Sequence, residues 1–261
     1  MYKQQKVAVI LPMLNEAPGI DSVLQALLAL GNERDETLVD DIIVCDNGSD
    51  DGSPLIAQAA GARVVYESQK GYGAACSKAI SALRSPDIVV FVDADRSVKV
   101  SEIHLLLDKL VSLNGDAYDL VIGSRTLGTC EKYSLTPAQR VGNHLASHLI
   151  QWRWRHPVSD LGPFRAIKYH QLLLLHMQDR RYGWTVEMQV KAIQQGLRVC
   201  EVPVSNLRRA GKSKISGTLL GTLGAGAGII GMIWKLHRQF CSKNSIFSQA
   251  KPPRATAAKS Q

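Results

Sequence analysis

Short apolar runs that alternate with helical patterns constrain the fold of this chain more than any other feature. In the first half, β-branched runs occupy residues 7–11, 42–45, 63–66, 88–92 and 120–122. Between them, apolar residues recur at helical spacing near residues 20–30, 53–60, 73–83 and 101–113. Strands that are nearly all apolar and alternate with helices indicate a parallel sheet covered on both faces. We therefore predict an α/β fold with a Rossmann-like, mostly parallel sheet flanked by helices.

The second half of the chain is less regular. Its patterns predict helices over 137–150, 169–176 and 184–195, a strand over 198–202, and a loop or short strand over 152–165. We assign residues 1–214 to one large domain and residues 215–242 to a Gly-rich C-terminal helical segment. That segment holds too many glycines to predict a membrane span. Residues 243–261 have too few apolar side chains to pack, which predicts a disordered tail.

The charge balance and the cysteines limit the partners and the compartment. A net charge of +8 favours an anionic partner. Basic runs with interleaved aromatic residues are lacking, which argues against nucleic acid. Five scattered cysteines without a C-x-x-C pair predict neither a disulfide framework nor a zinc site. We expect reduced thiols, no signal peptide before the first strand, and a cytoplasmic location; the oligomeric state is left open.

Polar residues follow the first four predicted strands, at the point where each strand ends. Their loops are Pro12-Met13-Leu14-Asn15-Glu16, Asp46-Asn47-Gly48-Ser49-Asp50-Asp51-Gly52, Lys70-Gly71-Tyr72-Gly73-Ala74-Ala75 and Asp93-Ala94-Asp95. Ligands of open α/β sheets bind outside the carboxyl ends of the strands. We therefore expect these loops to share one rim and to build one binding site.

The Asp93-Ala94-Asp95 motif follows the most apolar strand of the chain. Two carboxylates one residue apart can hold Mg²⁺ or Mn²⁺ together with substrate phosphates. The alternative is a surface turn that caps the next helix, since a motif this short often occurs by chance. Charges at the end of a buried strand are costly unless they are compensated, which favours the metal site.

Two further loops have a structural and a functional interpretation. The run that begins at Asp46 and Asn47 is either a plain turn or part of a pocket for a base and ribose. The run that begins at Lys70 is either a close-packed helix start or a phosphate site built from backbone N–H groups and a lysine. The Lys70 run is not a G-x-x-x-x-G-K-[ST] loop, and no G-x-G-x-x-G follows the first strand, so a P-loop hydrolase and a classical dinucleotide enzyme lack their signatures.

Taken together, these loops resemble family 2 glycosyltransferases of the GT-A fold. The resemblance is strongest to the branch of dolichol-phosphate mannose synthase and bacterial polyprenyl-phosphate glycosyltransferases. Further matches are Gly123-Ser124-Arg125, Asp160-Leu161-Gly162-Pro163-Phe164-Arg165, Trp184-Thr185-Val186-Glu187-Met188, Glu201-Val202-Pro203-Val204 and Gly211-Lys212-Ser213-Lys214. The ordered series covers roughly residues 6–220 and is far more specific than any one motif.

The resemblance implies a role for each matching residue. Pro12, Asn15, Glu16 and Asp46 would line the nucleoside pocket, and the donor would also contact Asn47 and Lys70. Asp93 would face the ribose or the metal, and Asp95 would hold the metal on the diphosphate. Asp160 would be a general base or would orient the acceptor. Phosphate groups would contact Arg125, Arg140, Arg209 and Lys212, with Arg125 also catalytic.

The implied activity is a metal-dependent, inverting transfer of a single hexose from UDP-glucose or GDP-mannose. The acceptor is left open between polyprenyl phosphate and a soluble or headgroup acceptor. The sequence departs from the family in having Asn47 in place of the second Asp of an Asp-Asp pair. A different class, a nucleotidyltransferase acting on a sugar phosphate, is the alternative, but it should carry a Gly-rich basic loop after the first strand.

Three features of the second half bear on metals and membranes. His144 and His148 have the spacing of metal ligands, but without a third ligand nearby a solvated helix face is favoured. The segment from Trp152 to His156 either lies at a membrane interface or packs its tryptophans inward. Basic residues on both sides of the Gly-rich segment suit a helix at an anionic membrane surface. The alternative there is a buried helix that packs through its glycines.

Overall fold

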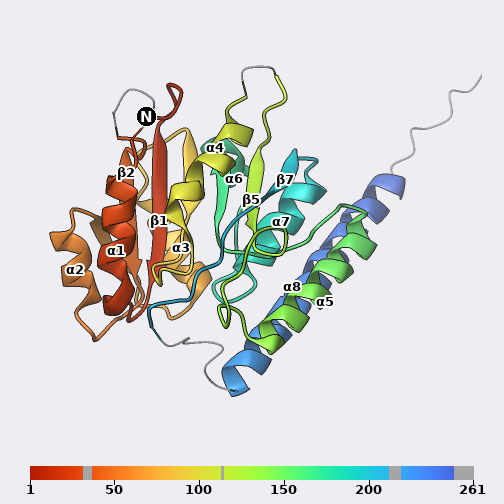
Figure 1. Ribbon diagram of the computed structural model, residues 1–261. Helices are drawn as coiled ribbons and strands as arrows, with labels where there is room; N and C mark the ends of the chain where they lie inside the picture. Colours follow the sequence, from red (N-terminus) through yellow and green to blue (C-terminus); the bar gives the residue numbers. More distant parts are fainter. Residues whose placement is uncertain (32–36, 113–114, 212–218, 250–261) are drawn as a thin grey trace, which may run out of the picture.

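A computed structural model describes residues 1–31, 37–112, 115–211 and 219–249 of the chain. The described residues form a seven-stranded sheet in the order β3-β2-β1-β4-β6-β5-β7 (Figure 1). Its strands are β1 Val7–Met13, β2 Asp41–Asp46, β3 Arg63–Tyr66, β4 Ile88–Phe91, β5 Leu120–Ser124, β6 Arg165–Lys168 and β7 Val199–Pro203. All neighbouring pairs are parallel except those that include β6. The predicted α/β fold with a mostly parallel sheet is therefore confirmed.

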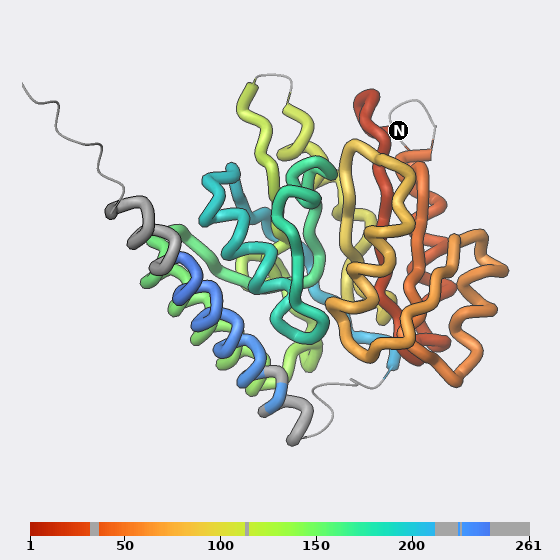
Figure 2. The backbone as a smooth tube through the Cα atoms, turned by 180° about the vertical axis from the view of Figure 1, so that it is seen from behind, coloured from red at the N-terminus to blue at the C-terminus, as the bar shows by residue number. Residues whose placement is uncertain are grey.

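Helices cover both faces of the sheet, as the uniformly apolar strands require. The helices of the described chain are α1 Ala17–Leu28, α2 Ser53–Ala59, α3 Tyr72–Ser81, α4 Ile103–Leu110, α5 Pro137–Trp154, α6 Tyr169–Leu174, α7 Trp184–Gln194 and α8 Leu219–Gln249, with a 3₁₀ turn η1 at Val100–Glu102. Buried side chains of α1, α2 and α4 pack on one face of the sheet. Those of α3, α6 and α7 pack on the other face, which Figure 2 shows from behind.

Strand β6 was not predicted, and it changes the geometry of the rim. It lies between β4 and β5 and runs antiparallel to both, with Arg165 paired to Phe91 and Ile122. The amino end of an antiparallel strand lies beside the carboxyl ends of its parallel neighbours. The loop that precedes β6 and carries Asp160 therefore reaches the same rim as the Asp93 loop.

The helix that starts at Pro137 continues beyond its predicted end. A capping box at Thr136 begins α5, and the helix ends at Trp154 with Arg155 in a left-handed conformation (φ 52°). The prediction of a loop or short strand over 152–165 is therefore wrong for residues 152–154, which belong to the helix. The side chain of Trp152 is exposed, whereas Trp154 is half-buried against Ile150 and its neighbours.

Helix α8 lies beside α5 at one end of the molecule (Figures 1 and 2). It packs through Met232, Ile233 and Leu236 against α5 and α7. The alternative of close packing through glycines is wrong for the four glycines whose surroundings are described, because added Cβ atoms would meet at most one atom, at 3.9 Å. These glycines are Gly224, Gly226, Gly228 and Gly231.

The predicted domain limits are described only in part. Residues 212–218 lie outside the described residues, and they include the limit proposed at residue 214. Helix α8 extends to Gln249, into the segment assigned to a tail, and residues 250–261 are also outside the described part. In the part of the chain that the structure describes, none of the helices is long and apolar enough to cross a membrane.

Candidate active site

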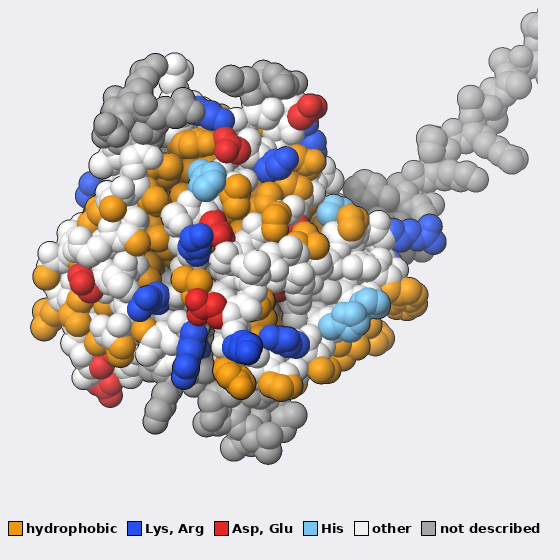
Figure 3. All heavy atoms as spheres, in the orientation of Figure 1, with side chains coloured by type: hydrophobic (Ala, Val, Ile, Leu, Met, Phe, Trp, Pro, Cys, Tyr) orange, Lys and Arg blue, Asp and Glu red, His pale blue; other side chains and the backbone are white. Residues whose placement is uncertain are grey.

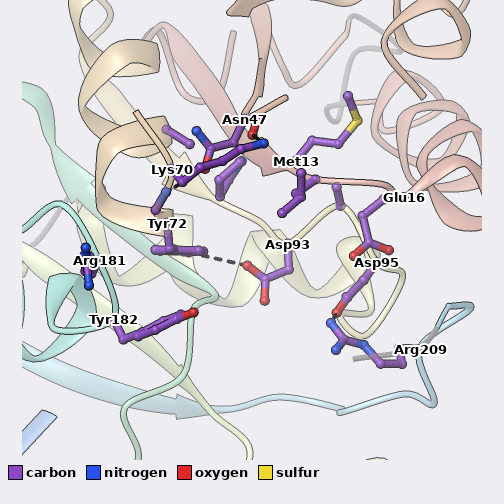
Figure 4. A pocket seen from close by; sticks show the side chains of 15 residues that line it. Met13, Glu16, Asn47, Lys70, Tyr72, Asp93, Asp95, Arg181, Tyr182 and Arg209 are labelled. Atoms are coloured by element: carbon purple, nitrogen blue, oxygen red, sulfur yellow. Dashed lines mark hydrogen bonds and ion pairs between the residues drawn. The ribbon is translucent and has the colours of Figure 1, made fainter. Parts of the chain in front are cut away.

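The ends of the first four strands enclose a cavity of about 360 Å³ at the predicted rim. Figure 4 shows Tyr72, Asp93 and Tyr182 pointing toward the same space. The cavity is lined by Pro12, Met13, Leu14, Glu16, Asn47, Lys70, Gly71, Tyr72, Ala75, Asp93, Ala94, Asp95, Arg181, Tyr182 and Arg209. Residues from all four predicted loops therefore meet in one site.

Asp93 lies just beyond the end of β4, inside the cavity. One of its carboxylate oxygens, Oδ1, accepts a hydrogen bond of 3.4 Å from the hydroxyl of Tyr72 (Figure 4). The other has no hydrogen-bond partner among the described residues. Burial raises the pKa of Asp93, although the charges of Arg209 and Arg125 oppose the shift. A bound cation at this place would therefore stabilise the ionised carboxylate.

Asp95 is buried and is held in place by its own loop. Its Oδ1 accepts the backbone N–H of Ser97 at 2.8 Å, and its Oδ2 forms an ion pair with Arg209. The first turn of α1 packs on this loop through Gly19, where a Cβ would lie 3.2 Å from the carbonyl oxygen of Ala94. A larger residue at position 19 would displace the carboxylate loop.

The segment that carries Arg209 is attached to the same loop. The backbone N–H of Ala210 donates to the carbonyl oxygen of Asp95 at 3.0 Å, and that of Leu207 donates to Ser97 at 2.8 Å. These two bonds bring Arg209 to the cavity wall, where it lies beside Asp95 on the same side as Glu16 (Figure 4). The guanidinium supplies a positive charge beside two acidic side chains.

The carboxylates of Asp93 and Asp95 fit a hard divalent cation. Both line one cavity, and carboxylate oxygens are the ligands that Mg²⁺ and Mn²⁺ prefer. The described residues contain no group of three or more His, Cys, Asp or Glu side chains placed to hold a metal. A cation here would therefore complete its coordination with water and substrate phosphate, as magnesium sites commonly do.

Three of the residues predicted to bind the nucleoside form hydrogen bonds within and between the loops that follow β1, β2 and β3. Asn47 donates to the carbonyl oxygens of Glu67 and Gln69 at 2.9 and 2.8 Å and accepts from Gly71 at 2.7 Å. Asp46 accepts the N–H groups of Gly48 and Ser49. Asn15, in a left-handed conformation (φ 54°), accepts the N–H of Asp50 at 2.8 Å. Asn47 also lines the cavity, together with the predicted Pro12, Glu16 and Lys70, whereas Asn15 and Asp46 are not among the lining residues.

The start of α3 is a close-packed helix N-terminus. The N–H groups of Gly73 and Ala74 donate to the carbonyl oxygens of Arg181 and Arg180 at 3.2 and 3.0 Å. A Cβ at Gly73 would lie 2.2 Å from the carbonyl oxygen of Asp179. The alternative in which these N–H groups face phosphate is therefore wrong. The amine of Lys70 donates to the carbonyl oxygens of Asn47 and Gly48 at 2.9 and 3.1 Å.

The loop between α6 and α7 adds a cavity wall that was not predicted. It contributes Arg181 and Tyr182, and α3 contributes Tyr72. Buried Glu187 holds this loop by accepting the N–H groups of Gln178 and Asp179 at 3.0 and 2.7 Å. The family match at Glu187 was the only sequence signal near this wall, and it did not indicate which neighbours face the ligand.

A second cavity, of about 740 Å³, lies between α5 and the loop after β5. Its basic and polar lining includes the predicted Arg125 and Arg140, together with His144 and His148. The imidazole rings of the two histidines lie 4.4 Å apart between centroids, on the exposed side of α5. The charge of Arg125 also lowers the pKa of Asp93, so this arginine links the two cavities electrostatically.

Asp160 is fully buried and paired with Arg125 through two side-chain hydrogen bonds, of 2.7 and 2.8 Å. Burial opposes ionisation of Asp160, but the hydrogen bonds and charge of Arg125 outweigh it and hold its pKa below the ordinary value. Glu201 accepts the N–H groups of Ser159 and Asp160 and so fixes the loop. Predicted Lys212 lies outside the described residues.

The Rossmann-like sheet and the strand-end Asp-x-Asp cavity define a glycosyltransferase of the GT-A fold. The chain belongs to glycosyl transferase family 2, whose family model matches residues 8–172. An uncharacterized glycosyltransferase of Mycobacterium tuberculosis is 37% identical over 83% of this chain and 93% of its own length. A dolichyl-phosphate hexose transferase of Haloferax volcanii is 30% identical over 82% of this chain and 88% of its length.

A solved structure shows the same fold with ligands bound. Glucosyl-3-phosphoglycerate synthase from Mycobacterium tuberculosis, in complex with Mn²⁺, UDP and glucosyl-3-phosphoglycerate, aligns with a TM-score of 0.71 and 25% identity. The alignment covers 90% of this chain and 81% of that protein. These findings confirm the family 2 resemblance, the GT-A fold and glycosyltransferase activity, and they exclude the nucleotidyltransferase alternative.

Proposed function

We propose that this glycosyltransferase transfers a single hexose from UDP-glucose or GDP-mannose to polyprenyl phosphate, with inversion at the sugar carbon. The observation that carries the proposal is a pair of cavities linked electrostatically by Arg125: one contains Asp93 and Asp95, and the other contains Arg125 and Arg140 and has no carboxylate among its described lining residues. The first suits a metal-bound diphosphate, and the second suits an anionic acceptor.

The donor occupies the carboxylate cavity. Asp93 and Asp95 would hold Mg²⁺ or Mn²⁺, which would offset the negative charge that develops on the leaving diphosphate. Arg209, which is paired with Asp95, would contact the diphosphate beside the metal, and Lys212 is proposed to assist it. Pro12, Asn15, Glu16, Asp46, Asn47 and Lys70 form the nucleoside end, where Asn15 and Asp46 act by shaping the loops.

The acceptor phosphate lies in the second cavity, on Arg125 and Arg140. The pairing of Asp160 with Arg125 supports a phosphate rather than a hydroxyl acceptor. A carboxylate with a lowered pKa is a weak base, and a phosphate oxygen that is already ionised needs no base. Asp160 is therefore proposed to position Arg125. The names of the relatives from Haloferax volcanii and Micrococcus luteus, the latter an undecaprenyl-phosphate mannosyltransferase, support a lipid phosphate.

An acceptor comparison tests this function. With each donor and Mn²⁺, the enzyme is given a short-chain polyprenyl phosphate, the matching polyprenol, or a soluble phosphorylated acceptor. We expect transfer to the polyprenyl phosphate and none to the polyprenol. Arg140→Gln should raise the KM for the lipid phosphate about ten-fold or more, because a charge-assisted contact is lost. The matched variant Arg84→Gln removes an exposed charge outside both cavities and should leave KM unchanged.

Two results would contradict the proposal. Transfer to the polyprenol would show that a hydroxyl acceptor is activated. Preference for 3-phosphoglycerate would instead place the enzyme with the structural relative that forms glucosyl-3-phosphoglycerate.

A further inference from the structure

Helix α5 carries an apolar stripe that faces away from the protein. Val141 and Trp152 are 68% and 80% exposed, and Leu145 is also exposed. Spacings of four and seven residues place the three side chains on one side of a helix. The buried Ala146 and Ile150 occupy the opposite side. The stripe therefore has no partner within the described part of the chain.

Helix α8 continues this apolar surface. Trp234 is 62% exposed, and Ile230, one turn earlier, is also exposed. The two helices lie side by side, and Arg153 of α5 contacts His237 and Phe240 of α8. Figure 3 shows hydrophobic side chains along the outer edge of this end of the molecule, with His and basic side chains beside them.

The charged side chains of α5 and α8 are all positive. None of the 23 Asp and Glu residues of the chain falls in the sequence of α5 or α8, which are 18 and 31 residues long. Exposed basic side chains surround the apolar stripe, namely Arg140, Arg155, Lys235 and Arg238. A surface with exposed tryptophans, several cations and no acids is complementary to an anionic bilayer.

We infer that the outer face of α5 and α8, defined by Val141, Leu145, Trp152, Ile230 and Trp234, docks on the surface of an anionic lipid bilayer. The described helices are too polar to span a membrane, so they lie on it. A protein partner would not require this exclusion of acidic residues from both helices.

The docking face adjoins both cavities. Arg140 and His144 line the acceptor cavity from the flank of α5 next to Val141 and Leu145. On the other side, α8 packs on the loop that carries the cavity-lining Tyr182: a Cβ at Gly183 would lie 3.0 Å from Met232, and one at Gly228 would lie 3.9 Å from Tyr182. If the acceptor is a lipid phosphate, as the proposed function states, docking would bring its headgroup to the acceptor cavity.

Vesicle flotation without any donor or acceptor tests this surface. The wild type should float with phosphatidylglycerol vesicles and remain behind with phosphatidylcholine vesicles. The double variant Trp152→Ser/Trp234→Ser should bind roughly 100-fold more weakly, since each buried aromatic side chain strengthens binding about ten-fold or more. Lys235→Gln/Arg238→Gln should weaken binding about 25-fold, at about five-fold for each basic side chain.

Matched controls keep the test specific. Leu55→Ser changes a side chain on α2 that is 70% exposed, and Lys78→Gln/Arg84→Gln removes two exposed charges elsewhere; both should float as the wild type does. Unchanged thermal unfolding would show that the helix variants are folded. The inference is overturned if the wild type does not float, if the tryptophan variant floats equally, or if that variant abolishes a dimer instead. Because flotation uses no sugar donor, its outcome is independent of the proposed reaction.

Discussion

Three carboxylates at the rim are buried or half-buried, and the negative charge of each is stabilised in a different way. Asp93 accepts one hydrogen bond from Tyr72, and burial raises its pKa. Asp95 is paired with Arg209, and Asp160 is paired with Arg125. Asp93 thus retains an oxygen for a cation, Asp95 is paired with a partly exposed arginine, and Asp160 is paired with Arg125 through two hydrogen bonds.

Replacement of Asp95 tests the metal assignment. Asp95→Asn keeps an oxygen for the N–H of Ser97 but removes the negative charge, so the metal and the leaving diphosphate lose their anchor. We expect kcat to fall by at least about 100-fold, the loss typical of a missing electrostatic contact in the transition state. The measurement is the transfer rate with Mn²⁺, and Asp21→Asn, an exposed site on α1, is the control. Wild-type kcat in Asp95→Asn would remove this residue from the mechanism.

The Asp160–Arg125 pair predicts a pH-dependent contribution to stability. The pKa of Asp160 is lower in the folded protein than its unfolded value of about 3.9, so the contribution is fully present above that value and is lost as the pH falls through the folded pKa. Asp160→Asn leaves Arg125 without its counter-charge and should lower the free energy of unfolding by about 3 kcal/mol at pH 7.

Urea unfolding of both proteins at several pH values measures this effect. The difference between wild type and Asp160→Asn should shrink as the pH falls below about 4. A difference that stays constant between pH 7 and pH 3 would show that ionisation of Asp160 does not stabilise the fold.

Sequence patterns located the site more readily than they described its contacts. Pro12, Glu16, Asn47, Lys70 and Asp93 all follow strands, and the rule that strand ends share a rim placed them in one cavity. Tyr72 lies in one of the predicted loops, but Arg181 and Tyr182 could not be predicted, because they reach the cavity through packing between α3 and a distant loop. The side-chain amide of Asn47 forms three hydrogen bonds to the loop that follows β3. The residue type alone does not indicate these contacts.

At the scale of elements, the contact between α3 and the loop before α7 determines the cavity wall. Gly73→Ala would place a Cβ 2.2 Å from the carbonyl oxygen of Asp179, so one of the two backbones must move. We expect a loss of about 2 kcal/mol in the free energy of unfolding, as for other overpacked sites, together with weaker donor binding.

A second glycine offers the matched control. An added Cβ at Gly142, which is exposed on α5, meets no atom within 4 Å, so Gly142→Ala should stabilise the helix by up to about 1 kcal/mol. Chemical denaturation of both variants compares them directly. Equal stability of Gly73→Ala and the wild type would mean that the loop is not seated on α3 as described.

Helices and strands were predicted correctly where the spacing of apolar residues alone determines them. The buried strands of the first half and their helices follow from uninterrupted apolar runs. Strand β6 was missed because it is short, begins with the buried Arg165 and is specified by its neighbours β4 and β5 rather than by its own composition. The end of α5 was missed because Trp152-Arg153-Trp154 has weak helical periodicity and is stabilised by contact with α8.

At the scale of the molecule, the sheet brings the Asp93 cavity and the Arg125 cavity to one rim, and α5 and α8 form the end beside them. The antiparallel β6 is what joins the two halves, because it carries the Asp160 loop to the carboxyl ends of β4 and β5. Family membership and the GT-A fold agree with this arrangement.

The central claim is that Asp93 and Asp95 build a metal-dependent nucleotide-sugar site. Calorimetric titration of the wild type with UDP-glucose and with GDP-mannose, each with and without Mn²⁺, tests it most directly. The account predicts that one of the two donors binds, at least about ten-fold more tightly with Mn²⁺, and that Asp95→Asn loses this gain. Binding of neither donor, or equal binding with and without the metal, would contradict it.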